Sequence, residues 1–287
     1  MERVQVDKYF TSGLKTDQFL EILHRRAVRR VALSVISGRS GSSYLAAILR
    51  GCGFGVGKEL FNQGAPERLS NIAEPNRFDV FLEHKLLRWT KNGVLYFQVT
   101  PARLRGLLTL VPGEAWRAAD ATVSLIYRRD IFSQAISKYN ASSTGMWHTT
   151  KTPQAPRAVN VDPRSPEAVA ALIASEQRGI RIAQEHFGVE TPFILYYEDI
   201  VAAPYESALA LLRHHGASQD CEAALTASIA DSQLPKKIVR DEFAAQYKAM
   251  RDAIPAFDEW LAKRMALGAH PTIAKEMRNA LLKAPPG

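Results

Sequence analysis

The stretch Val31-Ala-Leu-Ser-Val-Ile-Ser-Gly-Arg-Ser-Gly-Ser-Ser-Tyr-Leu-Ala-Ala-Ile-Leu49 predicts a strand, a tight turn and a helix in direct succession. Residues 31–36 form an apolar, β-branched run that is typical of a buried strand. Residues 37–43 are rich in glycine and serine and predict the turn, and apolar side chains at helical spacing follow from Tyr44. Such a junction directs backbone N–H groups and the positive end of a helix dipole to one place, which favours a bound anion.

The turn differs from the phosphate loop of ATP- and GTP-binding proteins, which reads G-x-x-x-x-G-K-[ST]. Ser42 and Ser43, rather than a lysine, follow Gly41, and the fixed charge is Arg39. The planar fork of an arginine and the hydroxyls of serines suit a tetrahedral oxyanion that is held without a metal. The alternative is an ordinary connection between a strand and a helix.

A second segment has the same order of elements. Residues 123–127 predict a buried strand, Arg128-Arg129-Asp130 follows it, and residues 131–140 predict a helix for which Asp130 can be the N-cap. Arg129 and Ser137 are eight positions apart. A second cation beyond a second parallel strand can bind a second phosphate, and solvated loop charges are the alternative.

The whole chain is typical of a globular α/β protein. It has 287 residues, with 46% hydrophobic and 23% charged residues. The predicted strands are residues 31–36, 80–85, 123–127 and 193–197, and the predicted helices between and after them are 44–50, 101–110, 131–140 and 167–186. This alternation predicts a parallel sheet with helices on both faces, three layers in all, and ligands at the carboxyl ends of its strands.

We expect a single domain over residues 1–287, in which residues 1–28 are an N-terminal extension and residues 207–287 are mostly helical. Residues 149–166 are polar and proline-rich, which is typical of a lid over an acceptor site or of a flexible linker. Both readings stay open.

The composition also bears on partners and location. The formal net charge of +8 is dispersed along the chain, so we expect no nucleic-acid partner, whereas transient contact with an anionic membrane surface stays open. No run of eighteen apolar residues and no signal-peptide core is present, and Cys52 and Cys221 make no disulfide framework. We therefore expect a cytoplasmic protein, with peripheral contact at the inner membrane surface as a further option. The histidines and cysteines are scattered, so we expect no metal.

The two segments together resemble the sulfotransferases that use 3′-phosphoadenylyl sulfate (PAPS), whose motifs are an R-S-G-[ST] loop and an R-x₇-S pair. The chain most resembles the bacterial trehalose 2-sulfotransferase-like family. Further similar segments are Lys58-Glu-Leu-Phe61, Phe81-Leu-Glu-His-Lys-Leu86, Gly145-Met-Trp-His148, and Tyr197-Glu-Asp-Ile200 followed by Pro204. The resemblance spans roughly residues 33–247 and implies a P-loop-like topology with PAPS as co-substrate.

The resemblance implies roles for the residues of both loops. Arg39 stabilises the transferring sulfuryl group. The 5′-phosphosulfate end of the donor is held by Arg39, Ser40, Gly41, Ser42 and Ser43. The 3′-phosphate is held by Arg129 and Ser137, and Arg128 is a further candidate because either arginine of the pair can turn inward.

Glu59 is the implied catalytic base, since the family has its proposed base at the matching point. Leu60 replaces an aromatic residue of the family motif, and the spacing from Arg39 is about one residue shorter. His84 is the rival, because animal cytosolic sulfotransferases use a histidine near a strand end. The implied acceptor site is lined by Glu59, Phe61, Lys85, Trp147 and His148.

The sequence therefore predicts a sulfotransferase that acts on a hydroxyl of a carbohydrate or glycolipid. A kinase or NTPase with a degenerate phosphate loop and a non-catalytic nucleotide-binding relic are the alternatives. A homodimer is suggested by the family but stays open.

Overall fold

A five-stranded sheet lies at the centre of the computed structural model, which describes residues 10, 12–59, 77–144, 162, 165–232 and 241–283. The strands are β1 (Arg30–Ile36), β2 (Gly55–Glu59), β3 (Val94–Val99), β4 (Thr122–Tyr127) and β5 (Phe193–Tyr196). They are ordered β2-β3-β1-β4-β5, and all neighbouring pairs are parallel. The predicted α/β class with a parallel sheet is confirmed.

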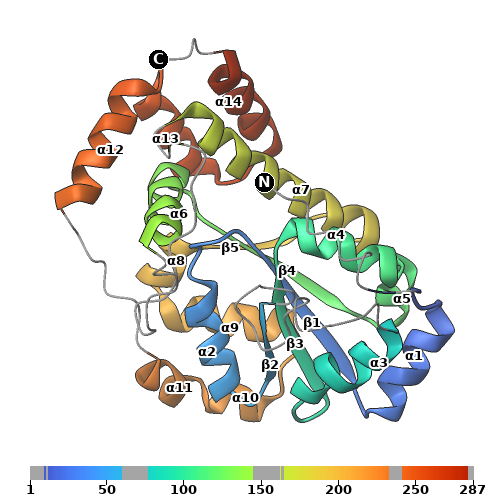
Figure 1. Ribbon diagram of the computed structural model, residues 1–287. Helices are drawn as coiled ribbons and strands as arrows, with labels where there is room; N and C mark the ends of the chain where they lie inside the picture. The colour runs from blue at the N-terminus through green and yellow to red at the C-terminus, as the bar shows by residue number, and fades with distance from the viewer. Residues whose placement is uncertain are drawn as a thin grey trace.

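Helices cover both faces of the sheet, as a parallel sheet requires (Figure 1). One core lies under α1 (Thr16–Arg25), α3 (Phe78–Phe81), α4 (Pro101–Leu110), α5 (Gly113–Ala118) and α7 (Pro166–Phe187). The opposite core lies under α2 (Ser42–Gly51), α9 (Pro204–His214) and α11 (Leu225–Asp231), next to the short α8 (Tyr197–Ala202) and α10 (Gln219–Ala223). The side chains of β1 alternate between the two cores, so the central strand is buried on both faces.

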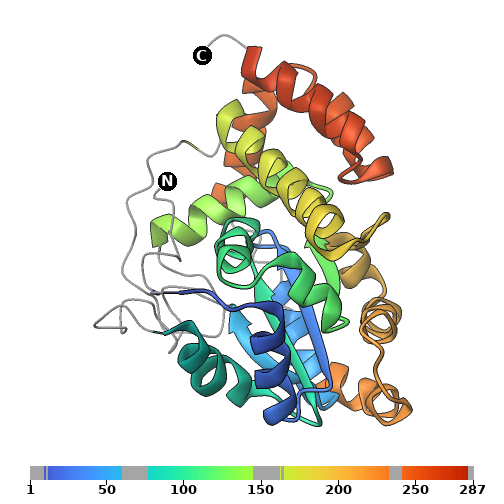
Figure 2. The same ribbon diagram turned by 90° about the vertical axis from the view of Figure 1, so that its right-hand side faces the viewer.

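The C-terminal helices form a third hydrophobic cluster beyond the sheet. α12 (Asp241–Ala253), α13 (Phe257–Leu267) and α14 (Pro271–Lys283) pack with α6 (Ile131–Thr144) and α7. Figure 2 shows these helices gathered at one end of the molecule, above the sheet. The mostly helical C-terminal part is as predicted.

The prediction of a strand over residues 80–85 is wrong. The segment lies in α3 and in a π-helical continuation, η3 (Leu82–Leu86). Its buried apolar side chains are Phe78, Phe81 and Leu82. Val80, between them, is 45% exposed, so the apolar residues follow the period of a helix rather than the two-residue period of a strand.

Neither β2 nor β3 is among the predicted strands. β2 contains two glycines, which have low strand propensity, and its register with β3 shifts between Val56 and Glu59. β3 is an apolar run that a period-based search can find, and it lies directly beside β1.

The connections that leave β1 and β4 run to opposite sides of the sheet. From β1 the chain passes through α2 to β2 on one side of the sheet, and from β4 it passes through α6 and α7 to β5 on the other. Because β1 and β4 are neighbours, their carboxyl ends border the crevice in which open α/β sheets bind ligands. Both predicted anion loops lie there.

Among the helices of the described residues, none has the length and apolar character that crossing a membrane requires.

Candidate active site

The loop after β1 has a backbone that only a few residue types adopt readily. Gly41, at the N-cap of α2, has φ +80°, and a Cβ there would lie 2.9 Å from Cδ2 of Tyr197. Arg39 has φ +69°, in the left-handed region that costs a non-glycine residue about 1–2 kcal/mol. The loop is thus a strained turn, and the first amides of α2 lie at its end.

Arg39 reaches from the loop after β1 to α6, which follows β4. Its Nε donates to Oγ of Ser137 at 2.9 Å. Burial lowers the pKa of Arg39, and the nearby charge of Arg128 lowers it further. Each of the two loops thus brings a cation to this edge of the sheet, which favours bound anions.

The serines of the loop differ in exposure. Ser40 and Ser42 are buried, and Ser43 is exposed. Within the described part of the chain, Oγ of Ser40 has no hydrogen-bond partner. Since buried hydroxyls are almost always hydrogen-bonded, this oxygen is suited to a ligand.

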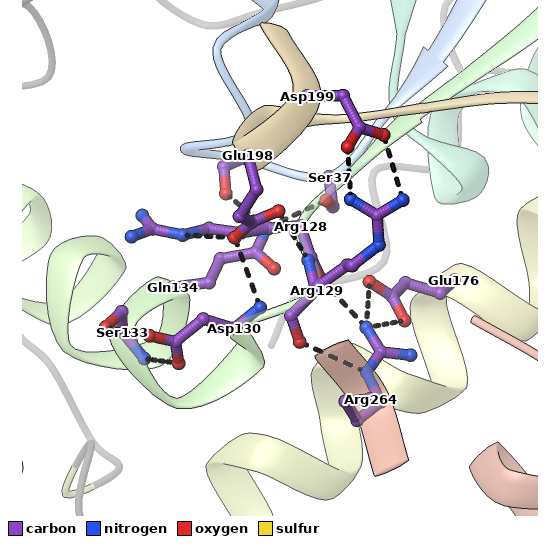
Figure 3. A network of polar contacts seen from close by, with 11 residues as sticks. Ser37, Arg128, Arg129, Asp130, Ser133, Gln134, Glu176, Glu198, Asp199 and Arg264 are labelled. Atoms are coloured by element: carbon purple, nitrogen blue, oxygen red, sulfur yellow. Dashed lines mark hydrogen bonds and ion pairs between the residues drawn. The ribbon is translucent and has the colours of Figure 1, made fainter. Parts of the chain in front are cut away.

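Arg129 is engaged by α8, which begins directly after β5. Its guanidinium makes a two-pronged pair with the carboxylate of Asp199, at 2.5 and 2.9 Å (Figure 3). It also lies over the ring of Tyr196, 4.2 Å from the ring centroid. The hydrogen bond to Asp199 raises the pKa of Arg129. Glu198 accepts hydrogen bonds from the backbone N–H groups of Arg129 and Asp130, at 2.9 and 3.2 Å.

Arg128 is placed differently from its neighbour. Its guanidinium lies 4.6 Å above the ring of Tyr197, the residue that packs against Gly41. Its Nε is buried, has no hydrogen-bond partner among the described residues, and is 3.6 Å from Oε1 of Glu198. Of the two arginines, Arg128 is therefore the one near the loop after β1. The lowering of the pKa of Arg39 by the charge of Arg128 agrees with this placement.

α6 is anchored at both loops. Asp130 caps it as predicted, accepting hydrogen bonds from the backbone N–H and the hydroxyl of Ser133 at 2.9 and 2.6 Å. Nε2 of Gln134 donates to Oγ of Ser37 at 2.7 Å and to the carbonyl of Gly38 at 2.8 Å. The helix after β4 is thus fixed to the loop after β1.

A family model supplies the decisive comparison. The model described as Stf0 sulphotransferase matches residues 107–250, half of the chain, from the end of α4 to α12. The chain belongs to the Stf0 sulphotransferase family. A comparison with curated proteins finds no match.

Membership makes this chain a sulfotransferase and favours sulfuryl transfer over the kinase or NTPase alternative. The matched residues include Arg128, Arg129, Ser137 and the Tyr197–Ala202 helix, whereas the loop with Arg39 precedes them. Hydrogen bonds from Arg39 to Ser137 and from Gln134 to Ser37 connect that loop to the matched part.

The two candidate bases of the sulfotransferase lie on different elements. The backbone of Glu59 is the last position of β2, in register with Gln98 of β3, at the carboxyl end of the sheet. His84 is exposed and lies in η3, not in a strand, so its likeness to the strand-end histidine of animal enzymes is lost. The backbone of Lys85 also belongs to η3.

Three predicted acceptor residues, Phe61, Trp147 and His148, lie outside the described residues, as does the predicted lid apart from Asp162, Ser165 and Pro166. Ser165 is the N-cap of α7, and its side chain accepts a hydrogen bond from the backbone N–H of Ala168. In the described ranges no group of three or more His, Cys, Asp or Glu side chains could hold a metal ion.

Two site residues escaped the sequence motifs. Gln98 is buried in β3, and its Nε2 donates to the carbonyl of Ser42, at the start of α2, at 2.7 Å, and to the hydroxyl of Tyr96 at 3.1 Å. A glutamine inside an apolar strand is the sequence signal that could have identified Gln98.

Lys138 is half-buried in α6, directly after Ser137, and makes no hydrogen bond or ion pair with the described residues. Helical spacing from Gln134 could have found it.

Gly41→Ala is expected to abolish donor binding and to lower the free energy of unfolding. The alanine would have to adopt a left-handed backbone conformation, and its Cβ would lie 2.9 Å from the Tyr197 ring. We therefore expect the free energy of unfolding to fall by about 2 kcal/mol. Gly38→Ala is the matched control, because a Cβ there meets no atom within 4 Å. Urea unfolding of both variants checks this, and equal stability of the two would contradict the role of Gly41.

Proposed function

We propose that this sulfotransferase moves a sulfuryl group from PAPS to a hydroxyl of a carbohydrate or glycolipid. The observation that carries the proposal is the meeting of two cationic loops at the carboxyl ends of β1 and β4, joined by the Arg39–Ser137 hydrogen bond. A donor with anionic groups at both the 5′- and the 3′-position of its ribose needs two such places. The buried hydroxyl of Ser40 and the strained turn at Arg39 fit an oxyanion there.

PAPS, when bound, supplies an activated sulfuryl group on a phosphate leaving group, and we treat the transfer by analogy with phosphoryl transfer. In this proposal Arg39 and the first amides of α2 stabilise negative charge on the leaving group. Glu59 removes the proton of the acceptor hydroxyl as the general base. The predicted residues Phe61, Lys85, Trp147 and His148 line the acceptor site.

A thermal-shift panel tests the donor. We expect adenosine 3′,5′-bisphosphate to raise the melting temperature without added metal, and ATP or GTP with Mg²⁺ to raise it much less. Stabilisation by ATP or GTP alone would sink the proposal and support the kinase alternative.

The acceptor is tested by transfer of labelled sulfate from PAPS into a mixture of sugars and lipids, followed by identification of the labelled product. A labelled carbohydrate or glycolipid supports the proposed acceptor class, and label only in other compounds contradicts it.

We further propose a cytoplasmic location with a small-molecule acceptor, no nucleic-acid partner, transient contact with the membrane surface and a homodimer.

Arg128→Met is expected to weaken the binding of adenosine 3′,5′-bisphosphate by about tenfold or more, because charge-assisted hydrogen bonds to a phosphate are lost. Arg129→Met is the matched comparison. Arg129 is already paired with Asp199, so its loss should lower the melting temperature by about 2–4 °C and affect binding less. Calorimetric titration of both variants decides between Arg128 and the original motif assignment of Arg129. A larger loss of affinity in Arg129→Met would restore the latter.

Lys138→Met is expected to stabilise the ligand-free protein and to weaken anion binding. Burial lowers the pKa of Lys138, and the described residues offer this ammonium no partner, so its charge costs stability. Lys138 lies one helical turn beyond Gln134, whose side chain contacts the loop after β1. Melting temperatures with and without adenosine 3′,5′-bisphosphate measure both effects. A lower melting temperature with unchanged affinity would show that Lys138 only supports the fold.

A further inference from the structure

The exit of β4 is held by a charged side chain from the far end of the chain. Arg264, in α13, is fully buried; its Nη2 donates to the carbonyl of Arg128 at 2.8 Å, and its Nε donates to the carbonyl of Arg129 at 3.3 Å (Figure 3). These two carbonyls belong to the arginines of the second anion loop. Arg264 therefore contacts the backbone of this loop.

Arg264 is itself held by Glu176 of α7, which is also fully buried. Nη2 of Arg264 lies 3.1 Å from Oε1 and 3.0 Å from Oε2 of the carboxylate. Burial raises the pKa of Glu176 to about 7, against the opposing effect of Arg264. Replacing a buried ion pair by apolar residues is often neutral or stabilising, so stability alone gives little reason for this pair.

The opposite side of the same backbone is held by α8. Glu198 accepts hydrogen bonds from the backbone N–H groups of Arg129 and Asp130. Arg264 donates hydrogen bonds to the carbonyls of Arg128 and Arg129. The peptide groups between these residues are therefore hydrogen-bonded from both sides and have a fixed orientation. This orientation decides where the side chain of Arg128 leaves the backbone.

We propose that Arg264, oriented by Glu176, is a positioning residue of the anion site: it fixes the Arg128–Arg129 peptide so that the guanidinium of Arg128 stays over the ring of Tyr197, from where it binds the 3′-phosphate of the donor. This inference rests on the proposed donor site. It assigns the C-terminal helices a role in the recognition of the 3′-phosphate, for which Arg128 is the candidate ligand. Without Arg264 the two carbonyls lose their charged donor, and the direction of Arg128 is less restricted.

The test measures the ratio of two dissociation constants, that of adenosine 5′-phosphate divided by that of adenosine 3′,5′-bisphosphate. The ratio reports the 3′-phosphate contribution alone, so a general loss of stability does not change it. Arg264→Met is expected to lower the ratio by about tenfold, and Glu176→Gln, which keeps an acceptor for Arg264, by about threefold. Met277→Ala is the matched control, because Met277 is a fully buried residue of α14 in the hydrophobic cluster with α7.

Met277→Ala should lower the melting temperature and leave the ratio within about twofold of the wild-type value. An unchanged ratio in Arg264→Met and Glu176→Gln, with a wild-type ratio well above one, overturns the positioning role alone. If Arg264→Met does not fold, Glu176→Gln decides by itself. A wild-type ratio near one overturns the proposed donor site, and the positioning role with it.

Discussion

Glu59→Gln is expected to lower sulfuryl transfer by about 10²–10⁴-fold and to leave the binding of adenosine 3′,5′-bisphosphate unchanged. The amide has the size of the carboxyl group but cannot accept the proton of the acceptor hydroxyl. Glu59 ends β2 at the carboxyl edge of the sheet, two strands from β1, whose loop carries Arg39. Its position is thus compatible with an attack on a sulfuryl group held by that loop.

His84→Ala is the control that separates the two candidate bases. His84 is exposed and lies in η3, so we expect its loss to leave turnover within about twofold of wild type. Initial rates with saturating donor, together with calorimetric binding, measure both variants. Normal turnover in Glu59→Gln with a loss in His84→Ala would exchange the roles. Wild-type turnover in a variant that carries both substitutions would show that neither residue is the base. A wild-type protein without transfer would support the non-catalytic alternative.

The parts of the site that the sequence predicts are those in which local pattern and chemistry agree. The runs that became β1 and β4 are continuous and β-branched, and each is followed by a short turn and an amphipathic helix. Since parallel strands place their carboxyl ends at one edge, two such units suffice to bring Arg39 and Arg128 to the same crevice. The family motifs then add the chemistry.

The parts that the sequence does not predict depend on contacts between distant segments. The motif assigns Arg129 and Ser137 to one phosphate, whereas the fold pairs Arg129 with Asp199 and Ser137 with Arg39. Such pairings are decided by packing over 70 and 98 positions of sequence, and no local pattern carries them. The π-helical segment over Leu82–Leu86 is a similar case, because a short apolar run is compatible with either period until its neighbours are known.

Arg39→Gly is expected to lower the catalytic efficiency by at least about 10²-fold while changing the stability of the ligand-free protein by less than about 1 kcal/mol. The effects of the substitution on stability oppose each other. Glycine relieves the left-handed backbone at φ +69°, but it also increases the entropy of the unfolded chain and removes the hydrogen bond to Ser137. In catalysis nothing offsets the loss, because the guanidinium is the fixed charge of the loop.

Arg39→Ala distinguishes strain from charge. Alanine removes the guanidinium as glycine does but keeps a Cβ in the left-handed region, so it should be about 1 kcal/mol less stable than the glycine variant at equal loss of activity. Urea unfolding and initial rates of both variants test this. Equal stability would refute the strained turn, and retained activity in either variant would remove Arg39 from the anion site. If both expectations hold, the turn keeps a residue that is costly to the fold because the anion needs its charge at that place, which is the usual relation between backbone strain and a functional site.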